Sequence, residues 1–264
     1  MLRGALRRPP RRLAGVPRFF VPASAVGGGR ASVDGDDAAH LARSLRATAG
    51  ERIVVADDAG TEHGVLLDTV TAERCAGAVE WSRPATGEPG VEVHVVQALA
   101  KDGMDELVEA LAEVGAASIW PVTTRRTVVR LDARRAEHRV ARWNAIARNA
   151  AGLAGRARPP VVHPLRGIAD VPAALPPNTR LMVCSPEAVM PLNAVLVRRE
   201  TRVAVCVGPE GGFDAEDLQA LRRSGAHEVH LGPRVLRARL AAVVALSVLL
   251  AGARELDTPV TPAP

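Results

Sequence analysis

The hydrophobic pattern changes character about a third of the way along the chain. Residues 18–83 contain short runs of β-forming residues, of which Glu51–Ala56 is compact and Val65–Val70 alternates less regularly. A turn at Asp57–Gly60 follows the first run, and Ala38–Arg46 has the spacing of a short helix. Because short strands bounded by turn residues are typical of small β folds, we expect a small β-barrel here.

A second pattern begins after Ser82–Gly90, which contains two prolines and two glycines and whose residues 84–90 we interpret as a linker. From residue 91 to residue 254, apolar strands alternate with amphipathic helices. The predicted strands are 91–99, 117–122, 181–185, 202–207 and 228–231, and the predicted helices are 102–114, 133–151, 214–224 and 236–253. Alternation of this kind predicts an α/β domain with a largely parallel sheet, whose ligands bind beyond the carboxyl ends of the strands.

Local signals set the ends of several predicted elements. Asp102 is a plausible N-cap of the first helix of the α/β domain, and Gly115 is positioned to end that helix. Asp214 and Gly225 have the same roles at the third helix. The basic residues 1–17 are predicted to be a disordered extension, and residues 255–264 a disordered tail.

Composition excludes several classes of protein. With 47% hydrophobic residues the chain can bury a core, so global disorder is excluded. No run reaches the roughly 18 apolar residues that a membrane span needs. Cys75, Cys184 and Cys206 are isolated and form no zinc-binding pair. We therefore expect a cytoplasmic protein that binds neither a metal nor a membrane.

The formal charge of +5 comes almost entirely from arginine, since Lys101 is the only lysine. Two interpretations stay open: a codon bias toward arginine, or binding to a polyanion. The chain has three Phe, three Trp and no Tyr, so few rings are available for stacking on bases. If the partner is RNA, charge and backbone shape must therefore dominate its recognition.

The most informative segment is Val205–Phe213, which reads VCVGPEGGF. A buried strand runs directly into a loop with three glycines, where a ligand can approach the backbone closely because no Cβ atoms intervene. The helix that Asp214 opens directs free N–H groups into the same space. The alternative is an ordinary β–α turn, which the rigid Pro209 and the acidic Glu210 make less attractive.

Residues 231–237, reading LGPRVLR, repeat this arrangement of strand, Gly-Pro turn and helix in the next β–α unit. Taken alone this loop could be a connector, but two such loops in consecutive units predict a shared binding site. The sequence contains no G-x-G-x-x-G fingerprint, no P-loop and no G-x-S-x-G elbow. The ligand is therefore not expected to be held by any of these standard motifs.

The run V-G-P-E-G-G-F followed by L-G-P-R-V-L-R resembles the RsmE family, the 16S rRNA uridine N3-methyltransferases of the knotted SPOUT class. Other residues between Arg18 and Arg254 occur in the family's order. They are His40, Leu45, Arg46, Gly50, Gln97, Lys101, Glu113, Val114, Gly115, Pro121, Arg126, Arg142, Trp143, Ile146, Arg156 and Pro160.

The resemblance implies a PUA-like RNA-binding β-barrel at residues 18–83 and a SPOUT domain with a deep trefoil knot at residues 91–254. It also implies a homodimer formed through the last helix, with 16S rRNA of the small ribosomal subunit as substrate. The methyl donor would be S-adenosylmethionine (SAM), bound by residues of the two loops. These are Val207, Gly208, Pro209, Glu210, Gly211, Gly212, Leu231, Gly232, Pro233, Val235 and Leu236.

The implied reaction moves a methyl group from a sulfonium to uracil N3. Because the donor is already activated, the protein mainly has to position both partners and stabilise an anionic uracil. Arg237 is our candidate for that electrostatic role. Arginines of both domains are expected to contact RNA, and they are Arg18, Arg43, Arg46, Arg125, Arg126 and Arg156. The arginines of the helix at 133–151 are interpreted as solvated charge.

The sequence departs from the family pattern at three places. Ala238-Arg239-Leu240 stands where Thr-Glu-Thr or Thr-Ser-Thr is usual, Gly152-Leu153 replaces Glu-Gln, and Ala110 replaces a common lysine. We expect the first two to lie near the active site. Two alternatives therefore stay open: a catalytically weakened paralogue that binds RNA or ribosomes, and a knotted methyltransferase with another RNA substrate.

Overall fold

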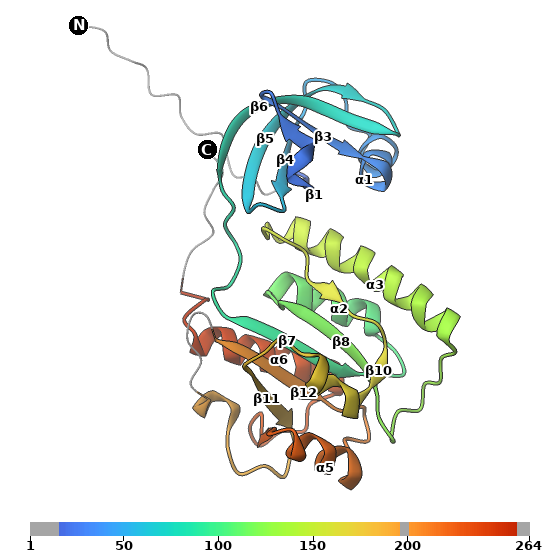
Figure 1. The fold of residues 1–264 in the computed structure, drawn as a ribbon, viewed down its shortest axis with the longest axis vertical. Coiled ribbons are helices and arrows are strands. Elements are labelled where there is room, and N and C mark those ends of the chain that lie inside the picture. The colour runs from blue at the N-terminus through green and yellow to red at the C-terminus, as the bar shows by residue number, and fades with distance from the viewer. Residues whose placement is uncertain (1–15, 196–200, 258–264) are drawn as a thin grey trace, which may run out of the picture. The chain divides into compact units, whose positions relative to one another are not determined.

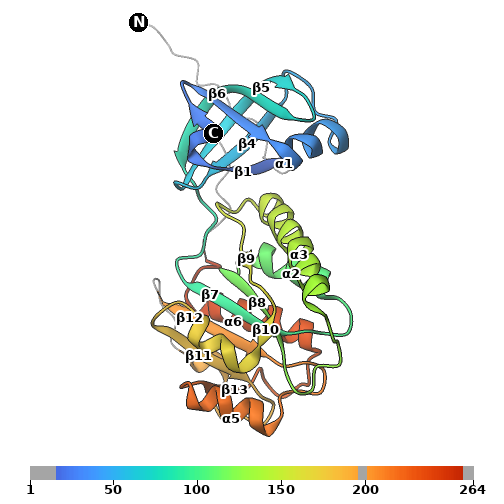
Figure 2. The same cartoon turned by 45° about the vertical axis from the view of Figure 1, so that its right-hand side comes forward.

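The computed structural model describes residues 16–195 and 201–257, so most of the predicted extension and tail lie outside the described residues. The chain divides into two compact units, and the boundary between them in the sequence falls between Gly87 and Glu88. Figures 1 and 2 show a sheet in each unit, with most of the helices in the second. Each unit is described by itself below.

The N-terminal unit is a six-stranded sheet with a short helical segment. In spatial order its strands are β1 (Arg18–Val21), β4 (Arg52–Asp57), β5 (Thr61–Val70), β6 (Arg74–Pro84), β3 (Arg30–Asp34) and β2 (Val26–Gly27). The strand β1 pairs parallel with β4, and the other pairs are antiparallel. Among the described residues no pairing joins the two ends of this order, so the predicted closed barrel is not found.

The helical segment of this unit covers one end of its core. The helix α1 (Gly35–Ala39) continues into a π-helical turn, η2 (His40–Ser44), and a short 3₁₀ turn, η1 (Ala23–Ala25), follows β1. Leu41 of η2 is fully buried among apolar residues of the sheet. The predicted helix is thus present, although it begins earlier than expected and ends in a different helical geometry.

The C-terminal unit is built on a parallel sheet. Its central strands, in spatial order, are β8 (Ser118–Thr123), β7 (Glu92–Ala98), β12 (Arg202–Val207), β11 (Thr179–Cys184) and β13 (His227–Val229). The two-residue strands β9 (Val161–Val162) and β10 (Arg166–Gly167) both pair with β8. Every pair is parallel, as the alternation of strands and helices predicted.

Helices cover both faces of this sheet, with a hydrophobic cluster under each set. On one face lie α2 (Met104–Val114), α3 (Ala133–Leu153) and α6 (Ala238–Gly252). On the other face lie α4 (Val171–Ala174) and α5 (Ala215–Arg223) with the 3₁₀ turn η3 (Ile168–Asp170). A further 3₁₀ turn, η4 (Leu192–Ala194), lies just before residues 196–200. Alternate residues of the strands point to opposite faces, so Val205 packs beneath the first set and Cys206 beneath the second.

Most element boundaries agree with the hydrophobic pattern, with one clear error. Asp214 accepts a hydrogen bond from the Asp217 N–H and caps α5, and Gly115 ends α2 with a φ of 120°. Asp102 does not cap α2. Gly103 precedes that helix with a φ of 79° and provides no side-chain cap, because the chain turns there in a left-handed conformation that glycine tolerates.

An aromatic stack joins β8 to the segment after β9. The ring of His163 lies on Trp120 with centroids 3.6 Å apart, and the Arg166 guanidinium lies 5.0 Å from the centre of the Trp120 ring. Burial, with the nearby charges of Arg166 and His94, lowers the pKa of His163 from 6.5 to about 4. His163 is therefore neutral in the folded protein at neutral pH.

Folding stability is expected to fall on acidification because of His163. Its pKa is lower in the folded than in the unfolded chain, so this contribution is complete above pH 6.5 and is lost as the pH falls toward about 4. His163→Phe, which keeps a ring on Trp120, should reduce the loss measured by urea unfolding at pH 7 and pH 4.5. His227→Gln on the exposed end of β13 is the control, and an undiminished loss in His163→Phe would contradict this assignment.

Candidate functional site

Both sequence motifs lie at the carboxyl edge of the parallel sheet. The strands β12 and β13 run parallel on either side of β11, so the loops that follow them emerge at the same edge. The segment 99–103 after β7 and the turn 124–127 after β8 emerge there too, because these strands are also parallel. Four connections from distant parts of the sequence thus meet where α/β proteins bind ligands.

The loop 208–212 folds back on itself so closely that a side chain at its first residue would be crowded. The Gly212 N–H donates to the carbonyl oxygen of Pro209 at 2.8 Å. A Cβ on Gly208 would lie 3.1 Å from both the Gly212 carbonyl carbon and the Phe213 nitrogen. Gly212 itself has a φ of +70°, which other residues rarely adopt. The glycines therefore form a tight backbone turn, which we call the glycine cradle, and its binding of a ligand stays a prediction.

The turn 124–127 supports this loop from the side of β8. The Arg126 guanidinium donates to the carbonyl oxygen of Gly211 at 2.7 Å. The neighbouring Arg125 N–H donates to the Asp217 carboxylate at 3.2 Å, and its side chain pairs with Asp214 and Glu216 at the start of α5. Arg125 and Arg126 are exposed, but their contacts hold the loop 208–212 and α5 in place, a role that the sequence analysis missed.

Asp217 is a buried carboxyl within this support. Its pKa is raised, mainly by burial, although the N–H groups of Arg125 and Asp214 oppose the shift. Since Asp217 connects the turn 124–127 to the first turn of α5, it fixes the loop that lies between them. Sequence spacing gave no sign of this, because 92 residues separate Arg125 from Asp217.

The segment 99–103 contacts the first sequence motif and the start of α6. The Lys101 N–H donates to the Glu210 carboxylate at 3.4 Å. At Gly103 a Cβ would lie 2.6 Å from Nη1 of Arg239, so the Arg239 side chain lies directly over this glycine. Arg239 is one of the residues by which the sequence departs from the family pattern. It is accommodated because Gly103 has no side chain.

The loop 231–237 combines buried and exposed residues. Leu231 and Leu236 pack against the core, whereas Val235 is 92% exposed. Gly232 has a φ of +94°, and its N–H donates to Nδ1 of His230 at 3.1 Å. Arg237 precedes α6 and is exposed, and its side chain makes no capping hydrogen bond to that helix.

A buried acceptor at the same edge lacks a partner. Oε1 of Gln97 is inaccessible and makes no hydrogen bond, while its Nε2 donates to the carbonyl oxygen of Ala98. Gln97 is paired in register with Val207, the residue before the glycine cradle. A buried acceptor without a partner is unusual, and it marks the strand end beside the loop 208–212 as incompletely satisfied. No cluster suited to a metal ion is present among the described residues.

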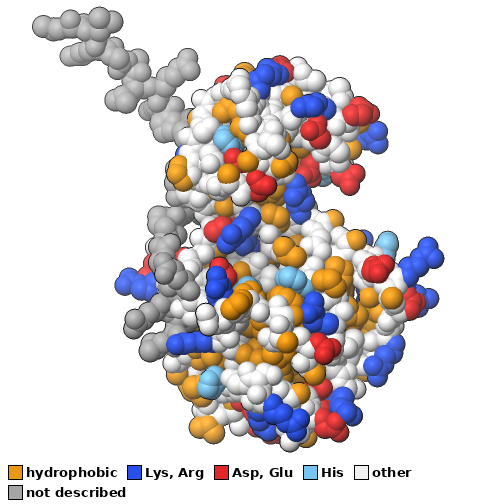
Figure 3. Space-filling model, viewed as in Figure 1, with side chains coloured by type: hydrophobic (Ala, Val, Ile, Leu, Met, Phe, Trp, Pro, Cys, Tyr) orange, Lys and Arg blue, Asp and Glu red, His pale blue; other side chains and the backbone are white. Residues whose placement is uncertain are grey.

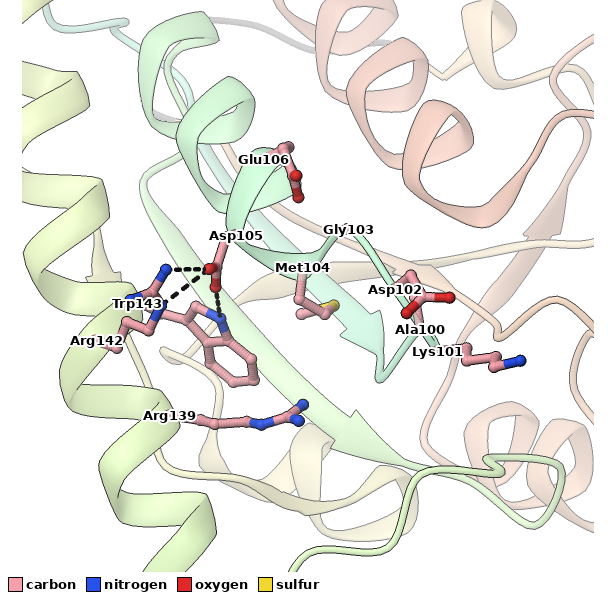
Figure 4. A pocket seen from close by; sticks show the side chains of 10 residues that line it. All are labelled: Ala100, Lys101, Asp102, Gly103, Met104, Asp105, Glu106, Arg139, Arg142 and Trp143. Carbon is pink, nitrogen blue, oxygen red and sulfur yellow. Dashed lines mark hydrogen bonds and ion pairs between the residues drawn. The ribbon is translucent and has the colours of Figure 1, made fainter.

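A cavity of about 410 Å³ opens beside the segment 99–103 (Figure 4). Trp143 and Arg142 of α3 line it, and Asp105 of α2 accepts hydrogen bonds from both. Figure 4 shows the Arg139 side chain extending from α3 beneath Trp143. The cavity therefore adjoins the cradle through Lys101, although the residues of the two loops do not line it.

Two of the arginines predicted to contact RNA have structural roles instead. Arg156 is 2% exposed, and its guanidinium donates to the Glu88 carboxylate and to the carbonyl oxygens of Ala112 and Ala116. Arg18 has a side chain only 10% exposed and pairs with the buried Glu62. Low exposure and pairing with a carboxylate argue against RNA contact at both positions, because such a guanidinium is less available to a phosphate. Arg43 and Arg46 are exposed, and RNA contact there stays a prediction.

One departure from the family pattern lies far from the site. Gly152 and Leu153 end α3, and the following Arg156 bonds to Ala116, just before β8 begins. This is the amino edge of the sheet, opposite to the loops, so the expectation that Gly152-Leu153 lies near the active site is wrong for a single copy of the chain. Ala238-Arg239-Leu240 does lie at the carboxyl edge, at the start of α6.

The described residues contain no helix of the length and apolarity needed for a membrane crossing. The fold and the glycine cradle define an α/β domain of the ligand-binding type. Residues 87–250 match the model of the RNA methyltransferase domain family. A ribosomal RNA small subunit methyltransferase E from Mycobacterium bovis is 34% identical over 242 residues, which cover 88% of this chain and 90% of the relative. The chain belongs to the ribosomal RNA small subunit methyltransferase E family.

Solved structures of similar proteins carry the same fold. A ribosomal RNA small subunit methyltransferase E from Neisseria gonorrhoeae bound to S-adenosyl methionine has a TM-score of 0.78 at 26% identity, covering 89% of this chain and 97% of that one. A putative methyltransferase from Legionella pneumophila in complex with SAM has a TM-score of 0.81 at 25% identity, covering 90% of this chain and 98% of that one. The similarity spans both units.

Proposed function

We propose that this protein methylates N3 of a uridine in the 16S rRNA of the small ribosomal subunit. Family membership makes the chain a SAM-dependent rRNA methyltransferase. The observation that supports the finer assignment is the similarity to enzymes of this name over 88% of the chain, and the intact glycine cradle at 208–212 supports the use of SAM. The reaction is assigned to the cytoplasm, where the small subunits are.

SAM would be held by the loops 208–212 and 231–236, with the turn 124–127 fixing the first of them. SAM supplies an activated methyl group on a sulfonium when it is bound. The tight turn at Gly208 supports this assignment in so far as it fixes the backbone of the loop 208–212, whose glycines carry no side chains to obstruct a ligand.

Arg237 is proposed to stabilise the negative charge that develops on uracil when N3–H is lost. It is exposed at the carboxyl edge, and its side chain caps no helix. Arg43, Arg46, Arg125 and Arg126 are proposed as RNA contacts. The PUA-like character of the N-terminal unit and the trefoil knot are also proposals, which rest on family resemblance.

A homodimer through α6 is part of the proposal. The helix buries Ala242 and Leu246 against the sheet, but Leu240 on its opposite side is 49% exposed. Val244 and Val248 continue this side at intervals of four residues and are only half-buried. An apolar stripe of this kind on a surface helix is suited to a second copy of the chain.

The assignment predicts that one methyl group is missing from 16S rRNA made without the enzyme. Methylation at N3 blocks the Watson–Crick edge of uracil, so reverse transcription should stop at the modified uridine in 16S rRNA from cells that carry the gene and read through it in cells that lack it. Purified protein with SAM should restore the stop on small subunits from the deletion strain, and Arg237→Ala should restore it far more slowly.

The competing hypotheses give other results in the same experiment. An unchanged stop pattern in the deletion strain would reject the 16S uridine as the target. If calorimetry then detects no SAM binding, the chain is an RNA-binding paralogue without activity. If SAM binds and another RNA is methylated, the substrate differs but the class of enzyme stands.

A further inference from the structure

The first half of α3 and the segment that precedes it form a second cavity, of about 790 Å³, which we call the arginine groove. Four arginines line it, against one carboxylate, Asp132. They are Arg130, Arg134, Arg135 and Arg139. Figure 3 shows Lys and Arg side chains projecting at the right-hand margin of the C-terminal unit, where Figure 1 draws the beginning of α3.

Most of this positive charge is not neutralised within the unit. Arg135 pairs with Asp132, which also caps α3 by accepting the Arg135 N–H. The other three arginines are exposed, and no hydrogen bond or close ion pair joins them to another described residue. Arg139 interacts with Asp105 only at longer range, and that carboxylate is already bound by Arg142. The amino end of α3 adds further positive potential to the groove.

The arginine groove is continuous with the candidate site. Arg139 lines both this groove and the 410 Å³ cavity of Figure 4, whose other end is formed by Lys101. The Lys101 backbone in turn bonds to Glu210 of the glycine cradle. The lining of the connecting cavity is balanced in charge, with Asp102, Asp105 and Glu106 against Lys101, Arg139 and Arg142. The excess positive charge therefore lies in the arginine groove, which joins the cavity at Arg139.

We propose that the arginine groove binds the phosphate backbone of the rRNA strand that flanks the target nucleotide. This inference rests on the proposed function, because it takes the polyanion at the site to be RNA. Unpaired guanidiniums match phosphate oxygens in geometry and charge. Trp143 is 2% exposed and His138 is the exposed ring of the groove, so four arginines outnumber the available stacking rings and backbone charge is what the groove mainly recognises. The α3 arginines are thus part of the substrate surface, not solvated charge alone.

The test compares full-length Arg134→Gln and Arg139→Gln, singly and combined, with Arg223→Gln on α5 as a control that removes the same charge outside the groove. Binding to small subunits is measured over a series of salt concentrations. Each groove substitution should weaken binding several-fold and reduce the slope of log Kd against log salt by about 1, whereas the control leaves the slope unchanged. SAM affinity and the rate at saturating subunits should stay at the native values.

Three results would overturn the inference. The first is an unchanged slope in the combined variant, and the second is an equal change in Arg223→Gln, which would reflect net charge only. The third is competition by polyglutamate but not by RNA, which would indicate an acidic protein partner. Failure of the proposed function gives a different result. The native protein would then not methylate the subunits, but it would still bind them in a salt-dependent way, and the groove substitutions would still weaken that binding.

Discussion

Gly208→Ala is expected to weaken SAM binding by about tenfold to hundredfold while the chain stays folded. A Cβ at this position would be 3.1 Å from two backbone atoms on the returning limb of the loop, at Gly212 and Phe213. Backbone cannot rotate away as a flexible side chain can, so the two limbs must separate. Overpacking of this kind costs about 1–3 kcal/mol, which corresponds to that range of affinities if the cradle must close for binding. Calorimetric titration with SAM measures the effect directly.

Gly27→Ala is the matched control, because a Cβ there meets nothing within 4 Å and the backbone conformation is ordinary. It should bind SAM with native affinity. Methylation of small subunits at low SAM should fall in Gly208→Ala in proportion to the affinity. Native SAM affinity in a folded Gly208→Ala protein would show that the loop 208–212 is not the cofactor site.

The fold of the C-terminal unit could be predicted because local and global signals agree there. Strand β12 lies where the run of five apolar residues at 203–207 places it, and α5 begins after its predicted cap Asp214. The N-terminal unit was less predictable. Strand β6 alternates buried and exposed residues and carries Arg74, Glu80 and Arg83, so it lacks the apolar run that identifies a buried strand. Its pairing with β3 and β5 decides its structure.

The site could be predicted only where chemistry is local in the sequence. The glycine cradle was predictable, because glycine freedom and the strand-to-helix turn are encoded within nine consecutive residues. The contact of Arg126 with Gly211 spans 85 residues, and the contact of Arg239 with Gly103 spans more than a hundred. Whether an arginine faces solvent or a buried carboxylate depends on such distant neighbours. The six arginines proposed as RNA contacts therefore include Arg156, which is buried, and Arg18, whose side chain is 10% exposed.

The departures from the family pattern acquire different meanings once they are placed in the fold. Gly152-Leu153 lies at the amino edge of the sheet, so it does not weigh against catalysis within one chain. Arg239 lies at the carboxyl edge, over Gly103 and near the segment that contacts the cradle. The hypothesis of a weakened paralogue therefore depends on the start of α6 alone, and SAM binding is its decisive measurement.

Arg156→Ala is expected to lower the free energy of unfolding by about 2–4 kcal/mol, because it leaves two backbone carbonyls without their donor and removes two charged hydrogen bonds from Glu88. The Glu88 carboxylate keeps the N–H groups of Ala157 and Arg158 and the exposed Arg158 side chain. The guanidinium bonds to Glu88 through Nε at 3.0 Å and Nη2 at 2.8 Å, and to Ala112 and Ala116 through Nη1 at 2.9 Å each. A typical domain has a stability of only about 5–15 kcal/mol, so a loss of this size is large. Urea unfolding at neutral pH measures it.

Arg158→Ala provides the matched control two residues away. Its side chain is 69% exposed and lies 3.7 Å from the same Glu88 carboxylate, so its removal should cost less than about 1 kcal/mol. The comparison also separates the two roles considered for Arg156. If Arg156 is structural, its removal lowers the stability of the protein much more than removal of the exposed Arg158. Its removal then leaves the rRNA affinity unchanged when binding is measured at temperatures at which the variant is fully folded. If Arg156→Ala instead kept native stability and lost rRNA affinity, the guanidinium would have to leave Glu88 on binding, and the original prediction of RNA contact would be restored.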